Sequence, residues 1–176
     1  RAGLPRRAYS PSASSEDGIN FSSAQAAYQD STIMTDPDVF KTDFDWRMFV
    51  SKGQNLDLVV SKDGGITFAK DNSFSWSGGG VCDTFNFNGT YRTYYCGQVA
   101  GIQSATGADS GTLTNESGSK VNYKDGIACD PSVIQLPDGS YLMYYKTQEI
   151  DSNNRANPVG GPVTPNSQPP GVPPTN

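Results

Sequence analysis

The stretch Ser61-Lys62-Asp63-Gly64-Gly65-Ile66-Thr67-Phe68 follows the apolar run Leu58-Val59-Val60 and decides the fold class. It has the composition of a tight turn between two strands. An aspartate carboxylate accepts hydrogen bonds from the loop backbone, and glycine takes the positive φ that such a turn needs. Shorter or looser versions occur at residues 15–21 and 104–112. A turn that recurs between apolar segments predicts a repeat of short antiparallel strands.

A second pattern begins with an aspartate and recurs at equal spacing. Asp36, Asp83 and Asp130 lie 47 residues apart, and each is followed by a turn and an aromatic strand. The second and third turns carry Asn88-Gly89 and Pro137-Asp138-Gly139, which are strong hairpin signals. The aromatic strands are expected at 46–50, 91–96 and 141–146. Each unit therefore reads as four strands, which is the signature of a β-propeller blade.

The composition agrees with many short strands. Apolar residues make up 35% of the 176 residues, below the usual share of a globular domain. Glycine (19) and proline (12) belong to turns rather than to helix interiors. Tyrosine (9) and phenylalanine (8) suit half-buried pleated surfaces. We therefore expect an all-β fold made of β-propeller blades, each of four antiparallel strands.

The two patterns together carry a resemblance to known propellers. The stretch from Ser61 to Phe68 resembles the Asp-box of sialidases. Asp130-Pro131-Ser132-Val133 and the following Leu136 to Tyr145 resemble the repeat of five-bladed propellers related to glycoside hydrolase families 43, 32 and 62. The resemblance covers residues 8–148 and implies a fold shared with sugar-processing enzymes. It implies activity less strongly, because Asp-boxes also occur in propellers that are not enzymes.

The repeat divides the chain into two regions. Residues 1–148 hold the blades, and the repeat units span about 8–22, 36–68, 83–114 and 129–147. The first unit supplies an outer half blade and the last an inner half blade, which with two complete units makes three blades. We expect either a fragment of a propeller or a ring that other chains complete. Residues 149–176 are rich in proline and glycine, which predicts an extended tail or linker.

The aspartates that lead each unit are the candidate catalytic residues. In family 43-like enzymes, inner-strand carboxylates from different blades serve as base, pKa tuner and acid. This resemblance implies Asp36 or Asp83 as the base and Asp130 as the tuner. The alternative is that these aspartates cap local turns and satisfy backbone N–H groups. No expected inner strand carries any of the glutamate candidates for the acid, which are Glu16, Glu116 and Glu149.

Aromatic side chains are the second set of candidates for sugar contact. Rings that stack on sugars would make a lectin-like module, and the candidates are Trp46, Trp76, Tyr94 and Tyr144. The alternative is packing between adjacent blades, which bury alternating aromatic residues. A sialidase would need a cluster of three arginines, and the expected strands carry only Arg47 and Arg92.

The three cysteines leave two interpretations open. A two-residue turn at Asn88-Gly89 places Cys82 opposite Tyr95, and one bulged residue would bring Cys82 opposite Cys96. A disulfide between Cys82 and Cys96 is one hypothesis, with Cys129 as the odd thiol. Three free, buried thiols are the other. None of the cysteines has C-x-x-C spacing, so we expect no metal site.

Charge and histidine content exclude several classes of function. The chain has no histidine, which removes imidazole bases, imidazole metal ligands and histidine-based triads, and we expect no cofactor. The net charge is -5, with basic residues concentrated only at Arg6-Arg7, so we expect no nucleic-acid partner. No run approaches the ~18 apolar residues of a membrane helix. The N-x-S/T sequons at Asn20, Asn88 and Asn115 predict N-glycosylation of an extracellular protein.

We interpret the chain as a secreted β-propeller module related to glycan-processing enzymes, with a carbohydrate-binding or assembly role rather than a catalytic one. One alternative is a glycoside hydrolase that uses channel-facing carboxylates. Another is a structural subunit of an extracellular fibre, docked through its proline-rich tail. The expected partners are carbohydrate and either other copies of the chain or missing blades.

Overall fold

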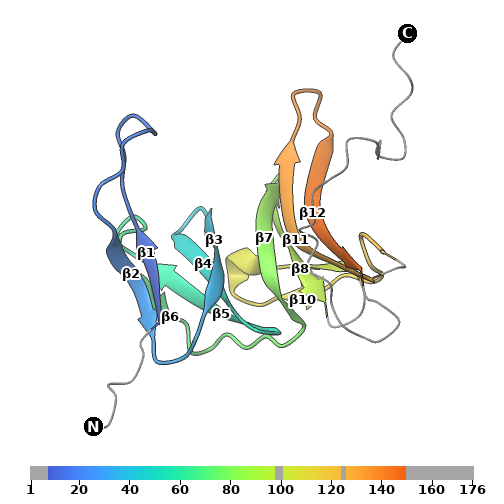
Figure 1. Ribbon diagram of the computed structural model, residues 1–176, viewed down its shortest axis with the longest axis horizontal. Helices are drawn as coiled ribbons and strands as arrows, with labels where there is room; N and C mark the ends of the chain where they lie inside the picture. The colour runs from blue at the N-terminus through green and yellow to red at the C-terminus, as the bar shows by residue number, and fades with distance from the viewer. Residues whose placement is uncertain (1–7, 98–100, 124–125, 150–176) are drawn as a thin grey trace.

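The computed structural model describes residues 8–97, 101–123 and 126–149, and all regular structure in them except one 3-10 turn is antiparallel β (Figure 1). The expected aromatic strands at 46–50, 91–96 and 141–146 are confirmed, since they fall within the strands β4, β8 and β12. The 3-10 turn, η1, covers Ala108–Ser110. The tail predicted at 149–176 lies outside the described residues from residue 150 onward.

Two of the sheets are complete four-stranded meanders. In each, the chain runs from the inner strand to the outer strand through consecutive antiparallel pairs. The first has the order β3-β4-β5-β6, with β3 at Thr35–Lys41, β4 at Trp46–Lys52, β5 at Asn55–Ser61 and β6 at Ala69–Lys70. The second has the order β7-β8-β9-β10, with bounds Gly79–Phe87, Thr90–Gly97, Ile102–Thr106 and Thr114–Asn115.

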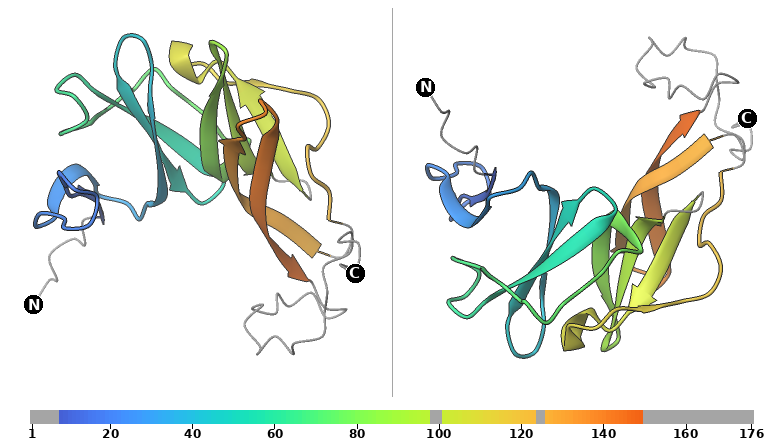
Figure 2. Two further views of the ribbon diagram at one scale, coloured as in Figure 1. Left: turned by 90° about the horizontal axis from the view of Figure 1, so that it is seen from above. Right: turned by 90° about the horizontal axis from the view of Figure 1, so that it is seen from below.

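The other two sheets are hairpins at the two ends of the described chain. The first pairs β1 (Ala8–Ser12) with β2 (Gln25–Asp30), and the last pairs β11 (Gly126–Gln135) with β12 (Tyr141–Glu149). The four sheets stand side by side along an open arc, with one hairpin at each end (Figure 2). Neighbouring sheets contact through their inner strands, β3 with β7 and β7 with β11. The fold is therefore all-β, with sheets arranged as β-propeller blades.

The turn between β1 and β2 shows which two strands of a complete sheet this hairpin matches. Between β5 and β6, the Ser61 hydroxyl donates to the Asp63 carboxylate at 2.7 Å, and Asp63 accepts the Thr67 N–H at 2.9 Å. Between β1 and β2, Asp17 accepts the Ser15 hydroxyl at 2.9 Å and the Asn20 N–H at 2.8 Å. We call both segments aspartate turns. The β1–β2 hairpin is therefore built like the third and fourth strands of a complete sheet.

Two apolar clusters hold the sheets together. The first lies between the complete sheets and consists of Phe40, Phe49, Leu56, Leu58, Phe74, Tyr91 and Ala108. The second joins the β1–β2 hairpin to the first complete sheet and consists of Tyr28, Met34, Met48, Val50 and Val59. The ring of Phe49 lies 5.4 Å from that of Phe40 and 5.5 Å from that of Phe74. Full burial of each such side chain stabilises the fold by about 1.5–3 kcal/mol.

Each inner strand contains one bulged residue in the left-handed region. The residues are Asp36 in β3, Val81 in β7 and Asp130 in β11, with φ of 49°, 49° and 51°. The strand registers shift at these three points. Positive φ is strained for a β-branched residue, so Val81 shows that the bulge is imposed by the packing of the sheets rather than by local preference.

The bulges correct one inference from the sequence. The equal spacing of Asp36, Asp83 and Asp130 does not mark equivalent positions, because Asp83 lies two residues beyond the bulge of its strand. The residue in that place is Asp38 in the first complete sheet and Ser132 in the last hairpin, opposite Phe49 and Tyr144 respectively. The aspartates that match structurally are therefore Asp38 and Asp83.

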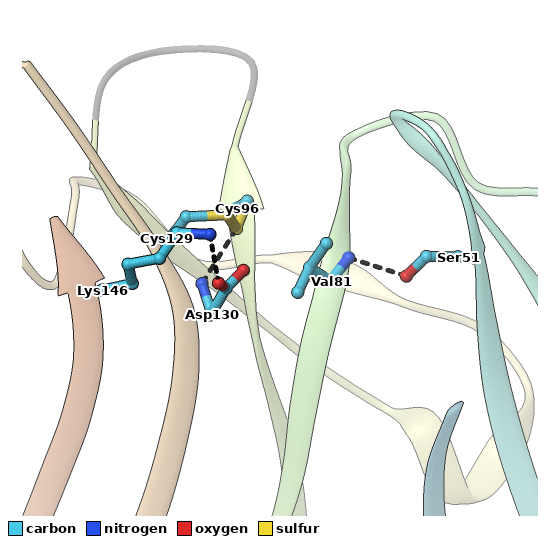
Figure 3. Close-up of a disulfide and its surroundings, with 6 residues drawn as sticks. All are labelled: Ser51, Val81, Cys96, Cys129, Asp130 and Lys146. Atoms are coloured by element: carbon cyan, nitrogen blue, oxygen red, sulfur yellow. Dashed lines mark hydrogen bonds and ion pairs between the residues drawn. A yellow bond between two sulfur atoms is a disulfide. The ribbon is translucent and has the colours of Figure 1, made fainter. Parts of the chain in front are cut away.

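The bulges also form the junctions between sheets. The Val81 N–H donates to the Ser51 hydroxyl of the preceding sheet at 2.7 Å, and the Asp130 N–H donates to the Cys96 sulfur at 3.2 Å (Figure 3). Ser51 and Cys96 occupy the same place, since they pair with Thr35 and Gly80, each the residue just before a bulge. A buried N–H needs a partner, and at both junctions the second strand of the preceding sheet supplies it.

The disulfide joins Cys96 to Cys129, and Cys82 is the free thiol (Figure 3). The predicted Cys82–Cys96 disulfide is wrong, and so is the assignment of Cys129 as the odd cysteine. The Asn88-Gly89 turn keeps Cys82 opposite Tyr95, and the bulge falls beyond Cys82. Cys96 therefore points to the next sheet, where Cys129 immediately precedes the bulge.

The first prediction concerns the aspartate turn. Asp63→Ala removes the acceptor for the backbone N–H groups of Ile66 and Thr67, and so should lower the melting temperature of the chain by several degrees. Asp43→Ala is the matched control, because Asp43 is an exposed aspartate that makes no hydrogen bond with the described residues. Equal melting temperatures for the two variants, measured by circular dichroism, would show that the turn contributes nothing.

The second prediction concerns the disulfide. It closes a loop of 33 residues, so Cys129→Ser should destabilise the protein by about 3–4 kcal/mol in urea unfolding. The denatured protein should show one reactive thiol before reduction and three after it. Cys82→Ser is the control, and it should show none before reduction and two after. Two reactive thiols in the unreduced Cys129→Ser variant are also expected, and none would contradict the pairing, because it would mean that Cys82 and Cys96 are joined.

Candidate functional site

The candidate site is built from carboxylates on the inner strands. Asp38 of β3 accepts hydrogen bonds from the hydroxyl and the backbone N–H of Thr84 in β7. Asp83 of β7 accepts the Val133 N–H of β11 at 2.7 Å. Thr84 and Val133 each lie one residue beyond the position of the structurally matched aspartate. The same contact therefore repeats from one inner strand to the next.

Asp38 is the most perturbed carboxyl group of the site. Burial raises its pKa to about 6, although the hydrogen bonds from Thr84 act in the opposite direction. The nearby charge of Asp83 raises the pKa further. The Cys82 thiol donates to Asp38 at 3.6 Å, and its own pKa is raised well above the ordinary value by burial and by the Asp38 charge. Asp38 therefore releases its proton at a higher pH than an ordinary aspartate.

Asp83 is less buried than Asp38, and its carboxylate is better placed to contact a ligand. Burial raises its pKa, and the Val133 N–H opposes the shift. Tyr94 lies directly opposite Asp83 in the β7–β8 register, so both side chains are on one face of the sheet. Burial raises the pKa of the Tyr94 hydroxyl, with the Arg92 charge opposing the shift. A carboxylate, a phenol and a guanidinium are thus close together.

Aromatic rings extend this face. Phe85 and Phe87 follow Asp83 at every second residue of β7, and Tyr141 of β12 lies 5.7 Å and 4.5 Å from their ring centres. The Arg92 guanidinium lies over the Phe87 ring at 5.0 Å. We call Asp83, Phe87, Arg92, Tyr94 and Tyr141 the polar–aromatic face.

The Arg92 side chain is fixed by an acid. Its guanidinium makes two hydrogen bonds to the Glu116 carboxylate, at 2.7 Å and 2.9 Å. The bond to Arg92 holds the pKa of Glu116 below its usual range. Glu116 is consequently ionised and engaged in an ion pair, and a protonated acid in a hydrolytic site would need the opposite shift.

The other predicted aspartates lie at the bulges and not with Asp83. Asp36 is exposed. Asp130 forms an ion pair with Lys146 at 2.6 Å, in which the lysine is exposed and the aspartate is partly exposed. The structure therefore brings Asp83 together with Asp38, which the sequence analysis did not select. The signal that could have found Asp38 is its place two residues after Asp36, at the same distance that separates Asp83 from Val81.

The four aromatic candidates are dispersed. Trp76 donates its indole N–H to the Gly79 carbonyl at 3.0 Å and packs edge-on against Tyr95, with ring centres 5.2 Å apart. Trp46 stacks beside Gly65 and lies under the Lys41 ammonium at 5.7 Å. Tyr144 is exposed on β12. Among the four, Tyr94 is the one placed beside Asp83.

The sequon asparagines differ in their surroundings. Asn88 is exposed in the two-residue turn, with φ of 51°. The Asn20 amide donates to Asp17 at 2.8 Å within the aspartate turn, and the Asn115 carbonyl accepts the Tyr95 hydroxyl at 2.5 Å. Glycosylation at all three asparagines stays a prediction, and Asn88 is the asparagine whose modification would disturb the fewest contacts.

One pocket lies on the first complete sheet, away from these carboxylates. It has a volume of about 630 Å³ and is lined by charged residues of the first complete sheet. Its Arg47 side chain donates to Asp45 at 2.8 Å and to the Ala108 carbonyl at 3.0 Å, which ties the sheet to η1. Because the arginine is already paired, the pocket has the character of a structural ion-pair network.

Within the part of the chain that the structure describes, one group of sulfur and carboxylate atoms has metal-like spacing, namely Cys96, Cys129 and Asp130. Both sulfurs belong to the disulfide, so they offer no thiolate to a metal ion. None of the helical structure in the described residues is long and apolar enough to cross a membrane.

Comparisons with known proteins return structural neighbours only. No family model matches the sequence, and no curated protein matches it. Among solved structures, the native arabinanase of Bacillus subtilis is 18% identical with a TM-score of 0.45, over 72% of this chain and 54% of the arabinanase. A family 43 endo-arabinanase from Bacillus licheniformis is 19% identical with a TM-score of 0.45, over 72% and 53%. The chain spans about half the length of either protein, and its activity must be argued from its own residues.

The third prediction follows from the pKa of Asp38. Its value of about 6 lies above the ordinary 3.8, so the folded state holds this proton more tightly than the unfolded state. The resulting stability is complete below about pH 4 and is lost as the pH rises through 6, by about 3 kcal/mol.

Urea unfolding at several pH values between 4.5 and 7.5 measures this effect. Asp38→Asn, which mimics the protonated carboxyl group, should remove most of the slope. Asp36→Asn is the matched control and should retain it, because Asp36 is exposed. Parallel slopes for wild type and Asp38→Asn would contradict the assignment.

Proposed function

We propose that the chain is a carbohydrate-binding part of a β-propeller, with the polar–aromatic face around Asp83 as its binding site. The observation that carries the proposal is the direct pairing of Asp83 with Tyr94, beside the rings of Phe87 and Tyr141. Sugars present hydroxyl groups next to apolar ring faces. A carboxylate and a phenol bind the former, and aromatic rings pack against the latter.

The state of the carboxylates favours binding over hydrolysis. Asp83 and Asp38 each accept a backbone N–H from the next inner strand, which gives them a role in joining the sheets. Glu116 is ionised in its pair with Arg92. No described glutamate stands beside Asp83 as a protonated acid, so the binding role accounts for more of the geometry.

Hydrolysis is the second candidate, and one observation favours it. Asp38 has a pKa of about 6 and interacts electrostatically with Asp83. Two carboxyl groups whose environments separate their protonation states are the basis of acid–base catalysis by glycosidases. In this alternative, Asp38 holds the proton and Asp83 is the ionised partner.

We also propose that the protein is extracellular. Its disulfide links two neighbouring sheets, and such bonds persist in oxidising compartments. The three sequons agree with secretion.

The fourth prediction tests binding and hydrolysis together. Calorimetric titration with soluble oligosaccharides, including arabinan, xylan and glucan fragments, should find a ligand class. Asp83→Asn and Tyr94→Phe should each weaken its binding by about tenfold, while the melting temperature stays close to that of the wild type. Asp43→Asn is the matched control and should bind normally, because Asp43 is an exposed aspartate away from this face.

Reducing-end release from the same oligosaccharides separates the two candidates. Under the binding proposal the wild type releases none. Release that is abolished by Asp38→Asn or Asp83→Asn would establish the hydrolase instead. Equal affinity of wild type and Asp83→Asn for every sugar would contradict the binding proposal, and equal release by the wild type and both variants would contradict the hydrolase.

A further inference from the structure

The two ends of the open arc are complementary halves of one sheet. The β11–β12 hairpin matches the first and second strands of a complete sheet, since β11 carries the inner-strand bulge. The β1–β2 hairpin, with its aspartate turn, matches the third and fourth strands. We propose that two copies of this chain associate head to tail, so that β12 of one copy pairs with β1 of the other and completes the sheet.

Exposure along β12 is the first argument. In the complete sheet, Phe49 and Val50 of β4 are both 0% exposed. The matching residues of β12 are Tyr144 and Tyr145, which are 61% and 45% exposed. No strand within the described residues pairs with the outer edge of β12. An unpaired edge with exposed aromatic side chains recruits another strand.

An apolar pocket at the other end is the second argument. It has a volume of about 310 Å³ and lies between β1 and the first complete sheet, where Pro11, Val39, Trp46 and Phe68 line it. Val39 is 50% exposed. At the two existing junctions, the second strand of one sheet contacts the inner strand of the next, β4 with β7 and β8 with β11. By the same rule, the second strand that pairs with β1 would contact β3, at this pocket.

Charge at the junction is the third argument, and it identifies the occupant. Ser51 and Cys96 are the second-strand residues that meet the next bulge, at Val81 and Asp130. The matching residue of β12 is Lys146, which pairs with Cys129 in the strand register. The bulge that lacks a partner of this kind within the described residues is Asp36 of β3.

The repeat therefore places the Lys146 ammonium of one copy beside the Asp36 carboxylate of the other. These charges are opposite. Lys146 now pairs with Asp130 of its own hairpin, and the two side chains are 61% and 40% exposed. An exposed pair of this kind contributes little to stability, so Lys146 is available to a second acceptor. A second copy supplies the missing strands, covers the apolar pocket and places a positive charge beside Asp36.

Sedimentation equilibrium of the full chain tests the association. The expected mass is twice 18.8 kDa. Lys146→Glu and Asp36→Lys should each raise the dissociation constant by about tenfold or more, because each sets like charges together. The double variant restores opposite charges and should return the constant to near the wild-type value. Val81 shows that a residue other than aspartate or glycine is accommodated at the bulge.

A wild-type chain that stays monomeric at high micromolar concentration would overturn the proposal, as would a double variant no better than the single ones. Monomers whose Tyr144 and Tyr145 resist modification would show that the chain covers its own β12 edge.

Cross-linking tests the strand pairing independently of charge. The β4–β5 register pairs Phe49 with Leu58, and the matching pair across the two copies is Tyr144 with Ser12. In a Cys82→Ser background, chains carrying Ser12→Cys and Tyr144→Cys separately should form an intermolecular disulfide after refolding together. The control mixture replaces Tyr144→Cys with Ile66→Cys, an exposed site on the aspartate turn, and should not cross-link. A monomeric cross-link in a chain carrying both cysteines would mean that one chain closes on itself, and would overturn the proposal.

Discussion

The structure depends on how each inner strand is joined to the sheet before it. A bulge in the inner strand turns one backbone N–H out of its own ladder, and that N–H must find a partner. The second strand of the preceding sheet supplies it, through the Ser51 hydroxyl at one junction and the Cys96 sulfur at the next. Two residues further along, Asp38 and Asp83 bond the next inner strand. Two junctions of the arc are therefore built on the same plan, and at one of them a disulfide reinforces the hydrogen bond.

This constraint explains why the carboxylates are perturbed. Asp38 is held against the next inner strand, away from solvent, and burial raises its pKa to about 6. A repeat that needs an acceptor at this position places carboxyl groups near the axis of the arc, whether or not a ligand is present. Sugar recognition can use such groups at little additional cost in stability, because they are already desolvated and held in place by the packing of the sheets. Architecture and binding chemistry then share residues, and a test must separate them by affinity and not by stability alone.

Local pattern was sufficient for the strands and hairpins. Alternating aromatic residues and the Asn88-Gly89 turn predicted β4, β8 and β12, and the same turn predicted the pairing of Cys82 with Tyr95. The equal spacing of Asp36, Asp83 and Asp130 predicted the wrong equivalent positions. A bulge shifts the strand register without requiring a particular residue type, and the sequence gives no sign that Val81 adopts a positive φ. The Cys96–Cys129 bond was missed for a related reason. It joins neighbouring sheets, and the packing of sheets is not encoded in the strand register.

One edge of the polar–aromatic face is formed by β12, a strand that pairs with one neighbour within the described residues. Tyr141, which packs on Phe87 at 4.5 Å, belongs to β12, and β12 is the outer strand of a two-stranded hairpin. A hairpin without a third strand is marginally stable by itself. Whatever pairs with β12 therefore also fixes the position of Tyr141 over Phe87. If a sugar binds better when that ring is fixed, completion of the sheet and binding of the sugar must strengthen each other to the same degree, because coupling between two binding equilibria is reciprocal.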